Sequence, residues 1–438
     1  MRKGFSVSGL QSPVSSLMSI LAAHLLLPMT SPPIEDGALS VEDGIILEVG
    51  RREELLKRYP SLPVEDLGEA AILPGLVNVH THLELTALHS LPKGPFLDWL
   101  LSLIEAKQGL DEGFFKRSAS QGIDMLLRTG TTSVGEVTSA GASFPALKAS
   151  GLRGIVYYEV LGLDPERAEA IAEGAGEKVE AMRRAAGGLL KIGLSPHAPY
   201  SLSERLLDLL SQLAQRLQLP LAVHLAETAE EAAYIRHGAG PILERLLPAK
   251  AGREGPSHSS RGETPVQFLA RHGLLSPSTL AIHAVHIGEG DRDLLASHGV
   301  SIAHCPRSNH FLQVGVAPLP AYLTKGMRVG LGTDSLASNE SLSLWDEMRF
   351  ALELHGGRVP AEELLRMATL GGAEALGLLK EIGSLEPGKR ADLIAVRLHS
   401  FGSTGLTTGG GDPYQFLITN IGPGDVLLTM VDGKVLFR

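Results

Sequence analysis

Cysteine is almost absent from this chain of 438 residues, in which Cys305 is the single example. One cysteine excludes an internal disulfide framework and suits a protein of the reducing cytoplasm. Basic residues are also outnumbered, with 39 Lys and Arg against 49 Asp and Glu, which gives a formal net charge of −10. A nucleic-acid-binding surface needs positive charge to offset the phosphates, so this balance argues against such a partner. We therefore expect a cytoplasmic protein that does not bind nucleic acid.

Long apolar runs are missing as well, apart from one stretch near the N-terminus. Arg2 and Lys3 precede an apolar segment, residues 14–29, that superficially resembles a secretory signal. His24 interrupts this segment, no small-x-small cleavage site follows it, and it is too short to span a bilayer. The sequence therefore predicts a poorly ordered N-terminal extension, residues 1–17, followed by a strand, and no membrane partner.

The middle of the chain is a series of eight apolar runs of strand length, most of them separated by helix-like segments. The runs are ILPGLVNVH, GTTSVGEV, RGIVYYEVL, LLKIGLSPH, PLAVHLAE, TLAIHAVH, VSIAHCP and VGLGTD. Such alternation is typical of parallel βα units, and eight units match the number that closes an α/β barrel. The predicted fold is therefore α/β, with a (β/α)8 TIM-type barrel over residues 72–382. One segment without strand or helix character, residues 249–264, is expected to be a mobile surface loop.

Both ends of the chain carry a different pattern, short apolar runs broken by Gly, Pro and Asp. Such runs indicate hairpins, and the pair Asp432-Gly433 is a strong hairpin turn between two apolar strands. We expect one small β-sandwich built from both ends, residues 18–71 and 383–438.

Polar residues gather at the carboxyl ends of five of the eight runs. His80, His197, His224, His283 and Asp334 each stand at such an end. In an eight-stranded α/β barrel these ends converge on one face, where active sites are built. Five strands that converge in this way predict a functional site.

Four of these positions have the chemistry of a metal site. His80 and His82 alternate at one strand end, so both imidazoles can face the same ion, and His224 and Asp334 add a nitrogen and an oxygen ligand. Three imidazoles and one carboxylate favour Zn²⁺, with Fe²⁺ as the alternative. One such ion with an open position lowers the pKa of bound water to about 7 and generates a nucleophile.

The chemistry also needs a residue that moves protons. Glu227 lies three residues after His224, where it can serve as proton shuttle, although a surface carboxylate that begins the acidic stretch ETAEEAA is the alternative. His283 can orient the attacking water or bind the metal, and His286 is a weaker alternative for the same role. Asp334 can accept the water proton as well as bind the ion.

These motifs together resemble the amidohydrolase superfamily, in the branch of nucleoside and purine deaminases and triazine chlorohydrolases. The resemblance rests on LPGLVNVHTHLELT, SPHAPYSLS, VHLAET, AIHAVH, HCPRSN, GTDSLASN and GSLEPGKRADLIAV and covers nearly the whole chain. It implies His80, His82, His224 and Asp334 as ligands, Glu227 as proton shuttle, His283 as a catalytic residue or fifth ligand, and His197 as a substrate contact. Binuclear relatives usually carry a lysine or glutamate at the end of strand four, whereas Lys191 lies at the opposite end of that run, so a single ion is expected.

Two of the motifs narrow the choice of substrate. HTHLELT, with Glu84, and HCPRSNHF resemble the aminodeoxyfutalosine deaminases of the futalosine route to menaquinone, and S-adenosylhomocysteine and methylthioadenosine deaminases are the nearest rivals. Glu84 is a candidate contact for ribose hydroxyl groups, with a plain surface carboxylate as the alternative. Arg307 is a candidate partner of a substrate carboxylate, with a loop-capping role as the alternative.

The sequence thus predicts a hydrolase that deaminates a purine nucleoside and releases ammonia. A guanine deaminase or chlorohydrolase is the second hypothesis for the function. A non-catalytic barrel that only binds a partner is the third. A homo-oligomer is compatible with the sequence, which does not specify it.

Overall fold

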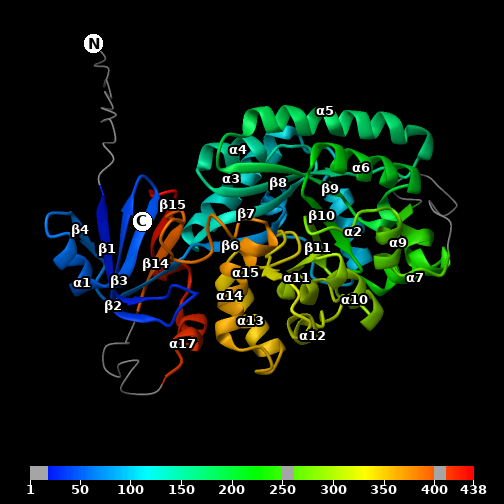
Figure 1. Ribbon diagram of the computed structural model, residues 1–438. Coiled ribbons are helices and arrows are strands. Elements are labelled where there is room, and N and C mark those ends of the chain that lie inside the picture. The colour runs from blue at the N-terminus through cyan, green and yellow to red at the C-terminus, as the bar shows by residue number, and fades with distance from the viewer. Residues whose placement is uncertain (1–17, 248–260, 399–410) are drawn as a thin grey trace, which may run out of the picture.

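The computed structural model describes residues 18–247, 261–398 and 411–438, which form an α/β barrel with a smaller sheet beside it (Figure 1). The predicted extension, residues 1–17, lies outside the described residues, as does most of the predicted loop 249–264. The candidate signal segment contains strand β1 (Ser19–Leu26), which confirms the strand that was predicted there. Among the described helices, none is both long and apolar enough to cross a membrane.

Eight parallel strands form the barrel, in the order of the eight apolar runs. They are β6 (Leu76–Thr81), β7 (Thr131–Thr138), β8 (Arg153–Val160), β9 (Leu190–Pro196), β10 (Leu221–Leu225), β11 (Thr279–His283), β12 (Ser301–His304) and β13 (Val329–Leu331). Each strand pairs with the next along the chain, so the (β/α)8 prediction is confirmed. Alternate side chains such as Val79, Ile155, Tyr157 and Ile282 form a buried apolar cluster that fills the barrel.

The barrel closes between its first and last strands. A parallel bridge joins Thr81 to Asp334, and the backbone N–H of Asp334 donates a hydrogen bond to the carbonyl of His80 across 3.0 Å. The closing contact therefore lies among the predicted site residues.

Amphipathic helices cover the outside of the barrel, and α3 (Glu112–Arg128) shows how the sequence forms them. Asp111 caps its first turn by accepting a hydrogen bond from the N–H of Phe114 at 2.7 Å. Ala119, Ile123 and Leu126 recur on one buried face at helical spacing.

The remaining helices connect or extend these units. They are α1 (Arg52–Arg58), η1 (Leu83–Leu88), α2 (Phe96–Ala106), α4 (Phe144–Ser150), η2 (Pro165–Arg167), α5 (Ala168–Ala186), η3 (Pro199–Ser201), α6 (Glu204–Leu217), α7 (Ala229–His237), η4 (Ile242–Leu246), α9 (Pro265–Arg271), α10 (Glu289–Ser297), α11 (Pro306–Phe311), α12 (Leu319–Thr324), α13 (Leu344–Leu354), α14 (Ala361–Met367), α15 (Leu370–Ala375), α17 (Pro413–Asn420) and η6 (Pro423–Asp425).

Both chain ends build the second sheet, as predicted. Its strands are β1, β2 (Ile34–Glu42), β3 (Ile45–Arg51), β4 (Val64–Asp66), β5 (Ala70–Pro74), β14 (Leu393–Arg397), β15 (Val426–Val431) and β16 (Lys434–Phe437). Hydrogen bonds join them into one continuous mixed sheet, in which β5 of the N-terminal part pairs with β14 of the C-terminal part. The turn between β15 and β16 is the predicted Asp432-Gly433 pair, with φ values of 53° and 74°.

The boundary between sheet and barrel differs from the prediction by a few residues. The run ILPGLVNVH is two strands, because β5 ends at Pro74 in the terminal sheet and β6 begins at Leu76 in the barrel. Gly75 separates them, and a Cβ atom there would come within 2.1 Å of the Thr132 side chain. The barrel therefore starts at Leu76 and not at residue 72.

Candidate active site

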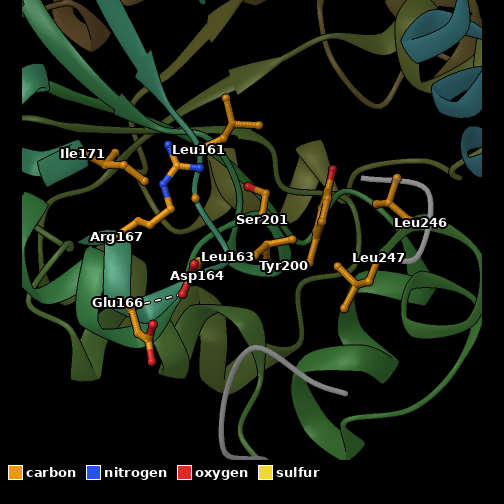
Figure 2. A pocket seen from close by; sticks show the side chains of 11 residues that line it. Leu161, Leu163, Asp164, Glu166, Arg167, Ile171, Tyr200, Ser201, Leu246 and Leu247 are labelled. Carbon is orange, nitrogen blue, oxygen red and sulfur yellow. Dashed lines mark hydrogen bonds between the residues drawn. The ribbon is translucent and has the colours of Figure 1, made fainter. Parts of the chain in front are cut away.

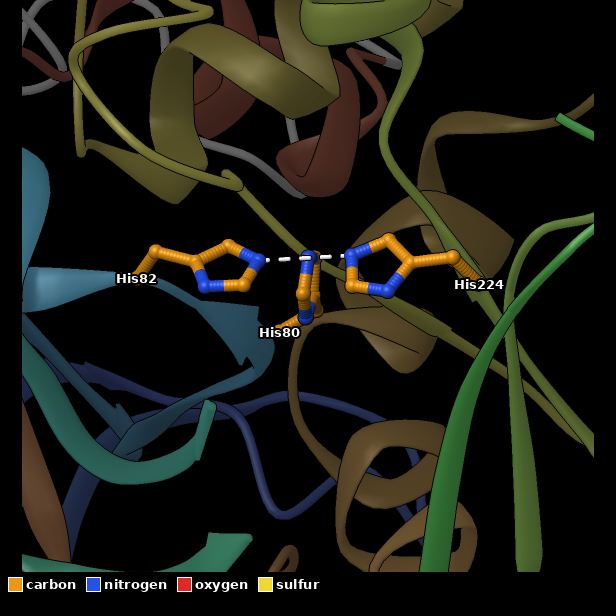
Figure 3. Close-up of side chains that lie close together, drawn as sticks. All are labelled: His80, His82 and His224. Atoms are coloured by element: carbon orange, nitrogen blue, oxygen red, sulfur yellow. Dashed lines mark hydrogen bonds between the residues drawn. The ribbon is translucent and has the colours of Figure 1, made fainter. Parts of the chain in front are cut away.

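Three imidazoles and one carboxylate meet at the carboxyl end of the barrel. His80 lies in β6 and His82 just after it, His224 lies in β10, and Asp334 follows β13. The Nε2 atoms of His82 and His224 are 3.3 Å apart, and Figure 3 shows the two rings facing each other across His80. Oδ1 of Asp334 lies 3.6 Å from Nε2 of His80 and 3.9 Å from Nε2 of His82.

These separations fit ligands of one metal ion. Two ligand atoms at 2.0–2.1 Å from a tetrahedral Zn²⁺ are about 3.3–3.4 Å apart. The His82–His224 separation of 3.3 Å equals this value, and the His80–Asp334 separation of 3.6 Å is near it. His80 is fully buried, and neither of its ring nitrogens has a hydrogen-bond partner in the described part of the chain. A buried imidazole without a partner is costly unless its nitrogen binds something, and an ion at this position binds it.

The environment keeps these imidazoles in the neutral form that binds metals. Burial, followed by the charge of His80, lowers the pKa of His82 to about 4, and burial lowers the pKa of His224 well below its usual value. The Nδ1 atom of His224 lies 3.0 Å from the backbone oxygen of His197, which holds the proton on Nδ1 and leaves the Nε2 lone pair toward the cluster.

Asp334 is held in place by three donors. Its Oδ2 accepts hydrogen bonds from the hydroxyl groups of Ser308 and Ser338 at 2.7 and 2.8 Å, and its Oδ1 accepts one from the N–H of Ser335 at 2.8 Å. Burial alone raises the pKa of Asp334, but the neighbouring His80, with His82, outweighs it and holds the pKa well below its usual range. The carboxylate is therefore ionised and fixed.

Glu227 and His283 form a second pair beside the cluster. Oε1 of Glu227 lies 3.5 Å from Nε2 of His283, whose Nδ1 contacts Oδ1 of Asn309 at 2.9 Å. Glu227 is only 4% exposed and precedes α7, so the alternative of a surface carboxylate is wrong. Burial, with the nearby Asp334 and Glu231 charges, raises the pKa of Glu227 well above its usual value, which is suited to a group that donates a proton.

The backbone around the site adopts an uncommon conformation. His283, Asp334 and Ala226 have positive φ values of 67°, 58° and 49°, which non-glycine residues rarely take. Such conformations cost free energy and persist where the surrounding structure enforces them, as it does at functional sites.

The pocket above the cluster, called here the metal pocket, has a volume of about 180 Å³. His82, His197, His224, Glu227, His283 and Asp334 line it. An apolar wall from α2, made of Phe96, Trp99, Leu100 and Leu103, faces these polar groups. The indole N–H of Trp99 donates to the backbone oxygen of Ala337 at 2.6 Å and fixes this wall. A mostly apolar pocket with a few converging polar groups is typical of a small-molecule site.

Two charged residues of the metal pocket were missed by the sequence analysis, Lys107 and Glu159. Glu159 stands at the carboxyl end of the predicted run RGIVYYEVL, so the strand-end rule that found the histidines could have found it too. Lys107 follows α2 in a segment without a motif, and nothing in the sequence marks it.

Glu84 has a different environment from the one predicted. It is buried, and its carboxylate accepts hydrogen bonds from the hydroxyl group of Thr138 and from the backbone N–H groups of Ser139, Ala142 and Ser143. The alternative of a surface carboxylate is therefore wrong. Glu84 is not among the residues that line the metal pocket, and its oxygen atoms are occupied by the loop between β7 and α4.

Arg307 also lies apart from the lining of the metal pocket. Its Nε donates to Oδ1 of Asn339 at 3.1 Å, its Nη2 lies 3.2 Å from Oε2 of Glu340, and its backbone N–H donates to Glu347. The loop-capping alternative describes these contacts, and the expected contact with a substrate carboxylate is not supported.

His286 and Lys191 are explained by contacts elsewhere. Nε2 of His286 lies 2.8 Å from the backbone oxygen of Val314, so this ring is used in the loop and not in the cluster. Lys191 pairs with Glu381 at 3.1 Å near the amino end of β9, far along the strand from His197. Cys305 is buried among apolar side chains of the barrel.

Comparison with known proteins gives one consistent relationship. A family model described as the amidohydrolase family matches residues 71–436. The chain belongs to the amidohydrolase family. It is 35% identical over 419 residues to the 5-methylthioadenosine/S-adenosylhomocysteine deaminase of Nitratidesulfovibrio vulgaris strain Hildenborough, covering 92% of this chain and 88% of the relative. It is 35% identical over 351 residues to the aminodeoxyfutalosine deaminase of Deinococcus radiodurans, covering 78% and 81%.

Solved structures show the same fold. An adenosine deaminase from Xanthomonas campestris with bound zinc superposes with a TM-score of 0.80 at 27% identity, covering 97% of this chain and 93% of that one. The aminofutalosine deaminase of Helicobacter pylori gives a TM-score of 0.82 at 25% identity, covering 96% and 100%. This amidohydrolase is therefore an enzyme, a hydrolase acting on carbon–nitrogen bonds.

Proposed function

We propose that the protein is a metal-dependent hydrolytic deaminase of an adenine nucleoside, with 6-amino-6-deoxyfutalosine as its substrate. The observation that carries the proposal is the cluster of His80, His82, His224 and Asp334 with the Glu227–His283 pair beside it in one pocket. Relatives of this family that bear the names of adenine-nucleoside deaminases support the reaction class.

The four clustered residues hold one divalent ion in this proposal, Zn²⁺ by preference and Fe²⁺ as the alternative. When bound, the ion supplies Lewis acidity that makes water a nucleophile at neutral pH. A further group, Glu159, His197 and His224, also places three potential ligand atoms together. His224 already donates its Nδ1 proton to the His197 oxygen, so it cannot serve a second ion through that atom. One ion is therefore assigned.

Glu227 supplies the proton movements of the proposed reaction. Water adds to C6 of the adenine ring, and Glu227 gives its proton to N1 as the ring loses aromaticity. Asp334 accepts the proton that water releases, and His283, which borders the same space, orients the water. That proton then passes to the exocyclic amine, which leaves as ammonia. The hydroxyl group on C6 returns its proton to Glu227 and becomes a carbonyl. One water is consumed and one ammonia released per nucleoside.

The metal pocket alone is small for a nucleoside with a large 5′ substituent, since ligand pockets commonly measure about 300–1,000 Å³. A second cavity of about 870 Å³, called here the outer cavity, adjoins it and shares Leu161 and Tyr200 with it. Its walls include the apolar side chains of Leu161, Leu163, Ile171, Leu246 and Leu247. We assign the 5′ substituent to this cavity.

Among the described residues that line the outer cavity, Arg167 is the one cation. Figure 2 shows the guanidinium group of Arg167 turned toward Leu161, while the Glu166 side chain points away from it. Arg167 has no side-chain hydrogen bond or ion pair with another described residue, and Asp164 is used to cap η2 through the N–H of Glu166. Futalosine-type substrates carry a benzoate in place of the 5′-hydroxyl group. The apolar walls and the guanidinium group of Arg167 suit a benzoate, so Arg167 replaces Arg307 as the candidate for the carboxylate.

A second candidate function is deamination of 5′-methylthioadenosine and S-adenosylhomocysteine. It is favoured by the names of several relatives, among them the one that is 35% identical over 92% of this chain. An amino-acid tail would place an ammonium group near Asp164 or Glu166 as well as a carboxylate near Arg167.

A screen of adenine nucleosides that differ only at C5′ tests both candidates. The purified protein is assayed for ammonia release with 6-amino-6-deoxyfutalosine, S-adenosylhomocysteine, 5′-methylthioadenosine and adenosine. We expect the highest kcat/KM with 6-amino-6-deoxyfutalosine. A preference for 5′-methylthioadenosine or S-adenosylhomocysteine moves the assignment to the second candidate, and no ammonia from any nucleoside refutes the reaction class.

A further inference from the structure

Glu159 is a buried carboxylate in the metal pocket for which the proposed reaction has no use. It is 7% exposed at the carboxyl end of β8. Its Oε2 accepts a hydrogen bond from the hydroxyl group of Ser139 at 2.6 Å. Its Oε1 has no hydrogen-bond partner in the described residues, and Nε2 of His197 lies 4.0 Å away, beyond hydrogen-bond range.

The reacting groups lie on other strands of the barrel. Glu227 follows the fifth strand, His283 ends the sixth and Asp334 follows the eighth, whereas Glu159 lies near the end of the third. Glu159 therefore lies beside His197 and His224, on a strand that carries neither Glu227 nor His283.

A buried carboxylate oxygen that lacks a donor costs free energy, and a ligand that brings the donor removes this cost. An adenine nucleoside has two kinds of donor, the exocyclic amine and the sugar hydroxyl groups. The amine is the leaving group and has to lie beside Glu227, His283 and Asp334. The hydroxyl groups remain as donors for Oε1 of Glu159.

We propose that Glu159 recognises the sugar of the substrate, its Oε1 accepting a hydrogen bond from a ribose hydroxyl group. This inference rests on the proposed function, which it extends by naming the residue that distinguishes ribose from deoxyribose. It also gives the sugar contact to Glu159 in place of Glu84, because both carboxylate oxygens of Glu84 accept hydrogen bonds from N–H groups of the β7–α4 loop.

The test compares adenosine, 2′-deoxyadenosine and 3′-deoxyadenosine as substrates of the metal-loaded wild-type enzyme and of Glu159→Gln. A hydrogen bond to a charged group changes kcat/KM by roughly 10- to 150-fold. We expect the wild type to prefer adenosine over at least one deoxynucleoside by such a factor. In Glu159→Gln that preference should fall to about 3-fold or less, because kcat/KM for adenosine drops, mainly through KM, while that for the discriminated deoxynucleoside hardly changes.

Glu84→Gln is the matched control, because it also neutralises a buried carboxylate near the site. We expect it to affect all three nucleosides equally. Equal losses on all three with Glu159→Gln, or loss of metal from that variant, would overturn the inference. If the variant does not fold, the wild-type enzyme alone tests the inference. Equal kcat/KM values of the wild type for adenosine and both deoxynucleosides also overturn it. Absence of turnover with every adenine nucleoside would instead refute the proposed function.

Discussion

The backbone N–H of Asp334 donates to the carbonyl oxygen of His80 across 3.0 Å, so the bond that closes the barrel also brings two potential metal ligands together. Oδ1 of Asp334 consequently lies 3.6 Å from Nε2 of His80. The contact that closes the barrel is thus also the contact that places Asp334 beside His80. Residues near the two ends of the barrel sequence become neighbours only when all eight strands are in place.

Replacing His224 by alanine should remove the metal ion. The substitution deletes one of the three imidazoles and leaves the apolar packing of the barrel in place. The circular dichroism spectrum should therefore stay that of the wild type. Metal analysis of the purified variant should fall from close to one ion per chain to nearly none. His286→Gln is the control, since its ring contacts Val314 and should leave the metal content unchanged.

Replacing Glu227 by glutamine should stop the proton transfer and spare the metal. The amide keeps the shape of the side chain but has no transferable proton, so kcat should fall by roughly 10²- to 10⁴-fold. Glu230→Gln, on the first turn of α7, serves as the control with near-normal kcat. Normal turnover of Glu227→Gln at saturating substrate would remove Glu227 from the mechanism.

Replacing Arg167 by methionine should weaken the use of a carboxylated substrate only. We expect kcat/KM for 6-amino-6-deoxyfutalosine to fall roughly 10-fold or more, since a charge-assisted bond is lost, and that for 5′-methylthioadenosine to stay within about 3-fold. Arg307→Met is the contrast, because Arg307 bonds to Asn339 and Glu340 and should affect both substrates alike. An equal fall of kcat/KM for both substrates with Arg167→Met would mean that Arg167 does not recognise the substrate carboxylate.

The raised pKa of Glu347 predicts that the stability of the protein depends on pH. It is fully buried, and burial raises its pKa from 4.5 to about 8, although hydrogen bonds from Asn339 and Arg307 act in the opposite direction. The folded state therefore keeps this proton up to about pH 8, whereas the unfolded state loses it above about pH 4.5. The protonated carboxyl group of Glu347 therefore contributes its full share to the free energy of unfolding below pH 4.5. This contribution is lost as the pH rises to about 8.

Urea unfolding at a series of pH values tests this prediction with Glu347→Gln. Between pH 5 and 8 the free energy of unfolding of the wild type should decline relative to the variant by on the order of a few kcal/mol, because one pKa unit corresponds to about 1.4 kcal/mol. Glu353→Gln changes an exposed residue of the same helix α13 and should follow the wild type. Parallel curves for wild type and Glu347→Gln would contradict the assignment.

The barrel and most of the cluster could be predicted because both depend on local pattern. Each strand has its own apolar run, and the carboxyl ends of parallel strands meet whatever the details of packing. His80, His224, His283 and Asp334 could therefore be placed together from the sequence alone. The division of ILPGLVNVH into two strands could not, because it depends on Gly75 fitting against Thr132, a contact made only in the folded chain.

The substrate contacts were harder to predict because they depend on which way a side chain turns. Glu84 and Arg307 stand in the expected motifs, yet backbone N–H groups bind the first and Asn339 binds the second. Trp99 of α2 and Lys107 just after this helix line the metal pocket, and no local pattern specifies the position of α2 over the barrel. Loop geometry, more than residue type, decides which polar groups face the ligand.

The most direct measurement is the titration of metal-free protein with Zn²⁺ while ammonia release from its best adenine nucleoside is followed. Because His80, His82, His224 and Asp334 are assigned to a single ion, activity should rise linearly and reach its plateau at one equivalent of metal per chain. A plateau only at two equivalents, or full ammonia release by the metal-free protein, would contradict the account.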